Sequence, residues 1–441
     1  MTTESGYRRR LSLFDSTMVV IGGIIGAGIF LSPSIVAQRV DRPGQIMLAW
    51  VVGGAVALVG ALCFGELGAR RPLAGGGYVY LRETFGELPA FLYGWTQLLV
   101  INSGGIAAVA IIFAGYACGL LGLGERGIKP LAVTAIVVLS IVNYLGIRPG
   151  SITQNILTIL KLLALAGVIG AGLWALAGEP AELGGAIEHH SSDDAGMWKL
   201  LGIALIPVLF SYGGWQHANH IGGEIRSPGK NLPRALLLGV ATVVFFYVLT
   251  NVAYLSALGV DGLAASSTPA ADTLVRMVGP AGGKLISLGI VFSTLGFVNL
   301  VILAAPRIYQ TMAADGLFFG WVAQIHPRYR TPSGAIVFQG TWAAALALSG
   351  TYAQLLDYVV FGDWIFFGLV VATLFVYRRR QDGNVTDFQT PGYPLTPLIF
   401  VATAAYVVVS SILWNPLNAL LGASLIALGI PVFLFWRRRR G

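Results

Sequence analysis

The stretch that decides the fold is GGIIGAGIFLSP, residues 22–33, which lies inside a hydrophobic segment long enough to cross a bilayer. Each glycine in a helix interior costs up to about 1 kcal/mol relative to alanine. Irregular backbone at membrane depth survives only where protein buries it or where it lines a cavity. Close helix packing could explain Gly22 and Gly26, but it leaves Gly23 and Gly28 unexplained. We therefore predict that this helix breaks halfway and that a cavity lies at the break.

Composition places the rest of the chain in the membrane as well. Of its 441 residues, 56% are hydrophobic and 11% are charged, which is too few charges to cover a soluble globule of this length. Because roughly 20 apolar residues span the hydrocarbon core, the sequence predicts an all-α polytopic membrane protein with twelve transmembrane helices. Their expected ranges are 13–37, 44–69, 86–118, 128–147, 154–177, 198–224, 233–258, 282–312, 334–350, 354–377, 395–413 and 417–436.

The positions of the basic residues predict the orientation. If both termini are cytoplasmic, most of the 28 Lys and Arg residues fall on the cytoplasmic side, as the positive-inside rule requires. The net charge of +8 is then a topology signal. The basic residues form short clusters beside the membrane and no stripe with interleaved aromatic residues, so we expect no nucleic-acid partner. We expect the lipid bilayer of the cell (plasma) membrane as the surroundings.

A second break is expected at FSYGGW, residues 210–215, in the middle of the predicted helix 198–224. The two broken helices are five helices apart, so they cross the membrane in opposite directions. Antiparallel broken helices that meet near the midplane are typical of a 5+5 inverted repeat. The expected division of the chain is a cytoplasmic segment 1–12, a ten-helix inverted-repeat core 13–377, a cytoplasmic loop 378–394, two accessory helices 395–436 and a basic cytoplasmic tail 437–441.

The two breaks expose opposite kinds of backbone group. Where the first helix restarts, free N–H groups at the positive end of a helix dipole suit a carboxylate. The residues that carry them are Gly26, Ala27 and Gly28. Where the first half of the sixth helix stops, free carbonyl groups suit an ammonium. These belong to Phe210, Ser211 and Tyr212. One donor cluster and one acceptor cluster match an α-amino acid. No charged residue adjoins either break in the chain, so we expect a neutral side-chain pocket.

Four charged residues lie at or near membrane depth. Lys161, within residues 155–165, either snorkels to the cytoplasmic interface or places its ammonium in an internal cation site. Glu66 either pairs with a nearby arginine or marks the cytoplasmic gate. Arg307, at the end of the eighth helix, has the sign and the expected depth to pair with Glu224. We take that pair as a hypothesis for an inner gate.

Several linked motifs resemble one known family. They are GIIGAGIF at 23–30, KLLAL at 161–165, FSYGGW at 210–215, and the run from Gly223-Glu224 to Asn231-Leu232-Pro233. Together they resemble the amino acid–polyamine–organocation superfamily and, within it, most closely the L-type amino acid transporters. The resemblance covers helices 1 to 8 well and helices 9 to 12 weakly. It implies a leucine-transporter type fold and a sodium-independent exchanger.

The resemblance also implies roles for individual residues. By similarity, the N–H groups of Ala27 and Gly28 hold the substrate carboxylate. The carbonyl groups that hold the amine are those of Ile24, Phe210 and Gly213. The ring of Phe210 closes the outer gate. Ala27 stands where relatives often have serine, so this chain lacks a hydroxyl contact to the carboxylate.

Two further residues are assigned only through the resemblance. Lys161 takes the place of the sodium ion that related symporters bind between helices 1 and 8. Asn299, in the eighth helix, matches a polar position near the substrate. We assign no chemistry to helices 9 to 12.

The sequence therefore predicts an exchanger of neutral L-amino acids that works by alternating access. A proton-coupled amino acid symporter is the alternative, because His217 and His220 share a helix face and could titrate near neutral pH. They could equally form hydrogen bonds in an aqueous inner vestibule without coupling. An intramembrane enzyme would need a nucleophile with a base, or a metal cluster, at membrane depth, and the sequence indicates neither. We expect no enzyme activity, cofactor or metal, and the sequence leaves open whether an accessory subunit binds.

Overall fold

The computed structural model describes residues 6–177, 204–350, 352–380, 388–414 and 416–440. In this part of the chain the regular structure is helical, and one isolated bridge joins Leu11 to Ile225. The helices are α1 Leu13–Ile24, α2 Gly28–Ala37, α3 Pro43–Arg70, α4 Gly77–Phe85, α5 Glu87–Thr96, α6 Ser103–Leu121, α7 Ile128–Tyr144, α8 Ile147–Ala177, 204–212, α10 His217–His220, α11 Pro228–Ala265, α12 Pro269–Val278, α13 Pro280–Ala304, α14 Pro306–Ala314, α15 Ser333–Ser349, α16 Tyr352–Arg380, α17 Leu395–Trp414, α18 Pro416–Ala427 and α19 Gly429–Arg440.

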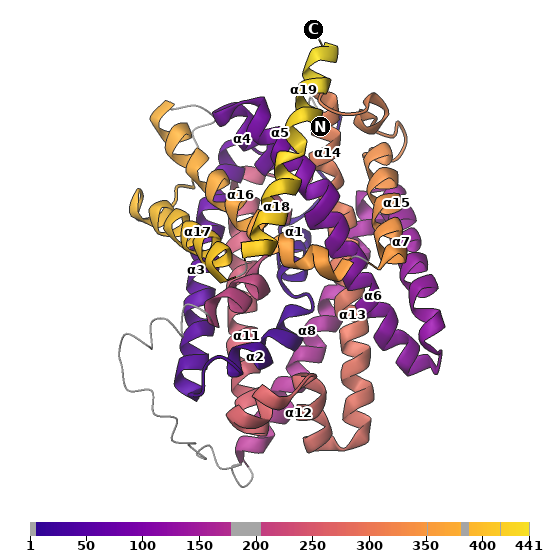
Figure 1. The fold of residues 1–441 in the computed structure, drawn as a ribbon, viewed down its shortest axis with the longest axis vertical. Coiled ribbons are helices and arrows are strands. Elements are labelled where there is room, and N and C mark those ends of the chain that lie inside the picture. Colours follow the sequence, from indigo (N-terminus) through magenta and orange to yellow (C-terminus); the bar gives the residue numbers. More distant parts are fainter. Residues whose placement is uncertain (1–5, 178–203, 351, 381–387, 415, 441) are drawn as a thin grey trace.

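The helices form an upright bundle around α1 and α2, and the described N-terminal residues and α19 lie at the same end of it (Figure 1). Within the described ranges, ten helical segments are long and apolar enough to cross a membrane, so the chain is a multi-pass membrane protein. The count of twelve predicted helices is not reproduced. The predicted ninth helix is the shorter apolar helix α15. The predicted sixth helix lies partly outside the described residues.

The first predicted break is confirmed. α1 begins at a capping box, in which the Ser12 hydroxyl accepts a hydrogen bond from the Asp15 backbone and the Asp15 carboxylate accepts one from the Ser12 backbone. It ends at Ile24, and α2 begins at Gly28. Residues 25–27 between them are not helical. One membrane span is therefore made of two half-helices joined at the glycine cluster.

The second predicted break is confirmed too, and it touches the first. The helix 204–212 stops before Gly213, and Gly214 has φ +119°, a conformation that other L-residues rarely adopt. A Cβ at Gly23 would lie 2.7 Å from the carbonyl oxygen of Gly214, and a Cβ at Gly214 would lie 2.2 Å from that of Gly23. The two backbone segments approach so closely that only glycine fits at either position.

The predicted helix 417–436 is divided into α18 and α19, and three other helices depart from their predicted form. The predicted helix 86–118 contains a π-helical turn, Gln97–Asn102, between α5 and α6. The predicted helix 282–312 is divided into α13 and α14, because Pro306 lacks the N–H that would continue the hydrogen-bond ladder. The predicted helix 154–177 begins earlier, at Ile147. The π-helical turn and the earlier start of α8 change the site, because they determine where Gln97 and Lys161 lie.

The contact between the breaks generates the first prediction. We expect Gly214→Ala to lower the melting midpoint of the purified protein clearly, because the added methyl meets backbone and the positive φ is strained. Together these effects are worth about 1–3 kcal/mol. Gly115→Ala in α6 is the matched control, since its Cβ would meet nothing within 4 Å. Equal melting midpoints for the two variants would contradict the proposed tight contact.

Candidate functional site

A cavity of about 790 Å³ lies where the two broken helices meet. Its lining includes most of the residues that the sequence predicted for a binding site: Ile24, Gly26, Ala27, Gly28, Phe210, Ser211 and Gly213. It extends past α2 to Arg39, an exposed residue beyond the end of that helix. The predicted site residues therefore converge, although nearly 200 positions separate the two groups in the chain.

The N–H groups of Ala27 and Gly28 are the donors available at the first break. In the described part of the chain, neither forms a hydrogen bond, and Gly28 opens α2, so the positive end of a helix dipole lies there. The N–H of Gly26 does not belong to this set, because it donates to the carbonyl of Ile24 at 2.9 Å. The prediction that Gly26 offers its N–H to a ligand is therefore wrong, since the chain turns tightly after α1.

The carbonyl groups at the breaks are partly occupied. The hydroxyl of Tyr247 on α11 lies 3.1 Å from the carbonyl oxygen of Ile24 and 3.2 Å from that of Ser211. The carbonyl of Phe210 accepts the N–H of Gly213 at 3.2 Å. A carbonyl oxygen has two lone pairs, so each can accept a second donor. Sequence reasoning missed Tyr247, because one tyrosine among aromatic membrane residues carries no distinguishing signal.

Two predicted residues do not line the cavity. The Tyr212 hydroxyl donates to the carbonyl of Trp50 at 3.1 Å. Asn299 is fully buried, and its Nδ2 donates to the carbonyl of Gly150 at 3.2 Å and to Oε1 of Gln154 at 2.9 Å. The sequence places Asn299 in a helix but does not show which face of α13 carries it. Its side chain points to α8, so the expected contact with a ligand is not present.

Lys161 reaches the broken end of α1. Its Nζ donates to the carbonyl of Gly22 at 3.1 Å and to that of Ile25 at 2.6 Å, and the side chain is fully buried. Because α8 begins at Ile147, Lys161 lies about four turns into the helix. The alternative in which it snorkels to the interface is therefore wrong. The ammonium satisfies carbonyl groups that have no helical partner and complements the negative end of the α1 dipole.

A carboxylate also lines the cavity. Asp363 on α16 accepts a hydrogen bond from Nε2 of Gln97, 3.2 Å away on the π-helical turn. Asn102, on the same turn, donates to Oε1 of Gln97 at 2.7 Å. Within the described ranges, no cation pairs with Asp363. The expectation of a neutral pocket did not include Asp363, because it considered only the chain neighbours of the breaks. The signal in the sequence that could have indicated Asp363 is a single acidic residue within an apolar span.

A buried ion pair lies under the N-terminal segment, and neither of its residues belongs to the cavity lining. Both Nε and Nη2 of Arg307 lie 2.8 Å from Oε1 of Glu224. Cζ of Arg307 lies 5.8 Å from the centroid of the Tyr7 ring. In the same segment, a backbone bridge joins Leu11 to Ile225. The hypothesis that Arg307 pairs with Glu224 is confirmed, and the N-terminal segment packs over the pair.

The structure also shows the surroundings of Glu66, His217 and His220. Glu66 accepts hydrogen bonds from Arg70 at 2.9 Å, Arg378 at 2.6 Å and the backbone of Thr390 at 2.6 Å, so its paired interpretation is confirmed. His217 lines the cavity, and His220 lies 3.0 Å from the Tyr93 hydroxyl. Both histidines are buried, and only His217 belongs to the cavity lining among the described residues.

A helical membrane protein with two broken helices around a central cavity has the architecture of a secondary transporter. This chain belongs to the amino acid permease family, which it matches over residues 11–436. It is 31% identical to the serine/threonine exchanger SteT of Bacillus subtilis, over all of this chain and 99% of that protein. It is 31% identical to the human b(0,+)-type amino acid transporter 1 (97% of this chain, 88% of that protein). It is 30% identical to the human large neutral amino acids transporter small subunit 2 (98% and 82%). The family and these relatives are transporters and not enzymes.

The buried pair of Glu224 and Arg307 generates the second prediction. We expect Arg307→Met to destabilise the protein by about 3–5 kcal/mol, because it leaves the Glu224 carboxylate buried without its partner. The double variant Glu224→Gln with Arg307→Met should lose less than the sum of the two single losses. Denaturation of the purified protein in micelles measures all of them.

The matched control is the pair of Arg71 and Glu83, whose side chains are 32% and 25% exposed. There, the single variants Arg71→Met and Glu83→Gln should each change stability by about 0–1 kcal/mol. Additive losses at Glu224 and Arg307 would mean that the two residues do not interact energetically.

Proposed function

We propose that this chain exchanges neutral L-amino acids across the plasma membrane by alternating access, without sodium and with both termini cytoplasmic. The observation that carries the proposal is the pair of unpartnered N–H groups, on Ala27 and Gly28, in one cavity with the carbonyl groups of the second break. A donor cluster opposite an acceptor cluster suits a zwitterion. Exchange is the activity that the name of the Bacillus subtilis relative gives, and neutral substrates appear in the name of the human transporter subunit.

In the proposed complex, the substrate carboxylate accepts the N–H groups of Ala27 and Gly28. Its ammonium donates to the carbonyl groups of Ile24, Phe210 and Gly213. The Phe210 ring is 44% exposed in this conformation, so we propose that it covers the substrate only when the outer gate closes. The opposite gate is the ion pair of Glu224 and Arg307, which must separate before substrate can leave on that side.

Lys161 explains why no sodium is needed. Its ammonium occupies the position beside the Gly22 and Ile25 carbonyl groups where a bound cation would otherwise be required. A covalently attached cation supplies the charge in every cycle. Transport then needs no ion gradient, and an internal substrate molecule drives the return step.

Asp363 changes the argument about which substrate side chains the cavity accepts. When Asp363 is ionised, it repels the side-chain carboxylate of an acidic substrate. Lack of a counter-charge is no reason to exclude cationic substrates, because Asp363 belongs to the lining. The preference for neutral substrates therefore rests on the names of the relatives, and competition by arginine is the most informative comparison.

The third prediction concerns Lys161. We expect Lys161→Ala to reduce sodium-free exchange of serine in proteoliposomes at least tenfold, because two buried carbonyl groups lose a charged donor, worth about 1.5–3 kcal/mol. The control is Lys284→Ala, which removes an exposed lysine near the start of α13 and should leave exchange unchanged. Full sodium-free exchange by a folded Lys161→Ala protein would contradict the proposed role of Lys161 as an internal cation.

A second candidate function is proton-coupled amino acid symport. The observation that favours it is Asp363, a carboxylate in the cavity that has no cationic partner among the described residues. In this mechanism Asp363 binds and releases the coupled proton while the cavity faces each side in turn.

The fourth prediction separates the two functions by uptake of labelled serine into proteoliposomes. We expect uptake to require internal serine, to be unchanged when choline replaces sodium, and to be inhibited by neutral amino acids and not by glutamate or arginine. A pH gradient without internal substrate should drive no uptake. If it does, the exchanger proposal is wrong. Asp363→Asn should then abolish that uptake while leaving counterflow at equal pH.

A further inference from the structure

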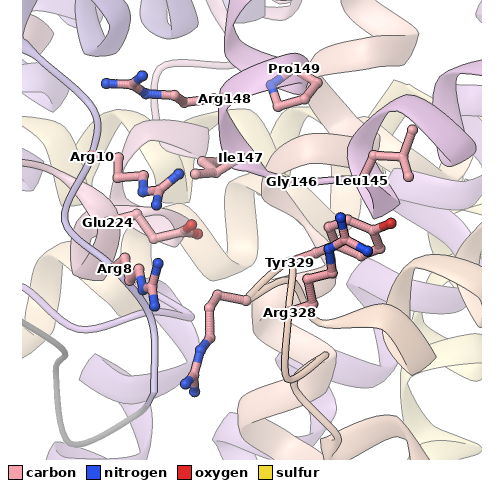
Figure 2. A pocket seen from close by; sticks show the side chains of 11 residues that line it. Arg8, Arg10, Leu145, Gly146, Ile147, Arg148, Pro149, Glu224, Arg328 and Tyr329 are labelled. Carbon is pink, nitrogen blue, oxygen red and sulfur yellow. The ribbon is translucent and has the colours of Figure 1, made fainter.

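Beside the closed gate, a smaller pocket of about 120 Å³ gathers five arginines. They are Arg8, Arg10, Arg148, Arg328 and Arg330. Figure 2 shows Arg8, Arg10 and Glu224 on one side of this pocket, with Arg328 and Tyr329 across from them. The N-terminal segment, the start of α8 and the loop 326–331 therefore converge here. The positive-inside rule explains why arginines are on this side, but not why three separate segments aim them at one pocket.

The positive charge of the pocket is not balanced within the described residues. None of the five arginines takes part in an ion pair there. The one acidic residue in the lining is Glu224, whose Oε1 pairs with Arg307 and whose Oε2 is buried without a hydrogen-bond partner among the described residues. Nε of Arg330 is buried and has no hydrogen-bond partner among the described residues. A buried donor without an acceptor is costly, so this one indicates a missing partner that accepts hydrogen bonds.

The loop 326–331 presents its arginines in a rigid form. The His326 ring accepts the N–H of Arg328 at 3.2 Å and that of Tyr329 at 3.1 Å. The Thr331 hydroxyl donates to the carbonyl of Tyr144 at 2.8 Å, which ties the loop to the end of α7. Arg330 has φ +57°, a left-handed conformation that costs a non-glycine residue free energy. An arginine at a strained position is more readily understood if its guanidinium is used.

The start of α8 contributes to the same pocket. Gly146, Ile147, Arg148 and Pro149 belong to the lining, and α8 runs from Ile147 to Ala177. The first N–H groups of a helix have no partner in the helix and lie at the positive end of its dipole. A helix start, a buried unpartnered guanidinium nitrogen and unbalanced arginines are each favourable for an anion.

We propose that this pocket binds a phosphate-bearing anion, either a lipid headgroup or phosphate from solution. The planar guanidinium fork matches phosphate oxygens in pairs, and a phosphate carries enough charge to neutralise arginines from different segments. The bound anion joins Arg8 and Arg10, whose segment covers the ion pair of Glu224 and Arg307, to the rigid loop 326–331. Binding therefore stabilises the conformation in which this gate is closed.

The test measures binding and not transport, so its outcome is independent of the proposed substrate. The melting midpoint of the purified full chain in detergent is followed against inorganic phosphate, with sodium chloride of equal ionic strength as reference. A parallel series uses vesicles of phosphatidylcholine alone or mixed with phosphatidylglycerol. Saturable stabilisation by inorganic phosphate would identify a soluble ligand, and stabilisation by phosphatidylglycerol alone would identify a headgroup.

The test variant is Arg328→Gln with Arg330→Asn, because asparagine removes the guanidinium and tolerates the left-handed backbone. We expect it to bind the stabilising anion at least tenfold more weakly. Arg8→Gln with Arg10→Gln tests the opposite wall, should the loop variant fail to fold. Arg438→Gln with Arg439→Gln, on α19, removes the same charge away from the pocket and should bind like the wild type. No stabilisation by either anion, or equal loss in this control, would overturn the proposal.

Discussion

The structure depends on the direct contact between the backbones of Gly23 and Gly214. A single broken helix is unfavourable in a membrane, because each break frees backbone groups that lipid cannot satisfy. When two breaks meet, the freed groups of one lie beside those of the other and enclose a shared cavity. The contact is possible only without side chains, since a Cβ on either residue would come within 2.7 Å of the opposite backbone. The glycine clusters thus serve one purpose, which is to let two half-helices from distant parts of the chain touch.

The freed groups at the first break are satisfied unevenly, and this unevenness gives the cavity its polarity. Lys161 and Tyr247 contact the carbonyl groups left at the end of α1, and the Ser293 hydroxyl donates to the carbonyl of Gly26 at 3.1 Å. The N–H groups of Ala27 and Gly28 have no such partner in the described part of the chain. Protein side chains therefore stabilise the acceptors while two donors remain available. A ligand with a carboxylate completes the arrangement.

The cavity and the buried ion pair differ in their exposure. The cavity reaches the exposed Arg39. The pair of Glu224 and Arg307 is buried under the N-terminal segment and lies outside the cavity lining. The pocket that gathers the five arginines includes Glu224 in its lining. Charge is thus concentrated around the pair that we propose as the inner gate.

The sequence by itself determined the membrane setting, both helix breaks and the opposite polarity of their backbone groups, because glycine clusters and apolar length are local properties of the chain. It also indicated that Arg307 and Glu224 pair, since sign and depth can be read from position. The tertiary structure alone decided that Asn299 faces α8, that the Gly26 N–H is consumed in a tight turn, that Lys161 reaches α1, and that Asp363 enters the cavity beside a π-helical turn. These outcomes depend on the rotation of each helix about its axis. That rotation is determined by packing against helices distant in the chain, for which hydrophobic length carries no information.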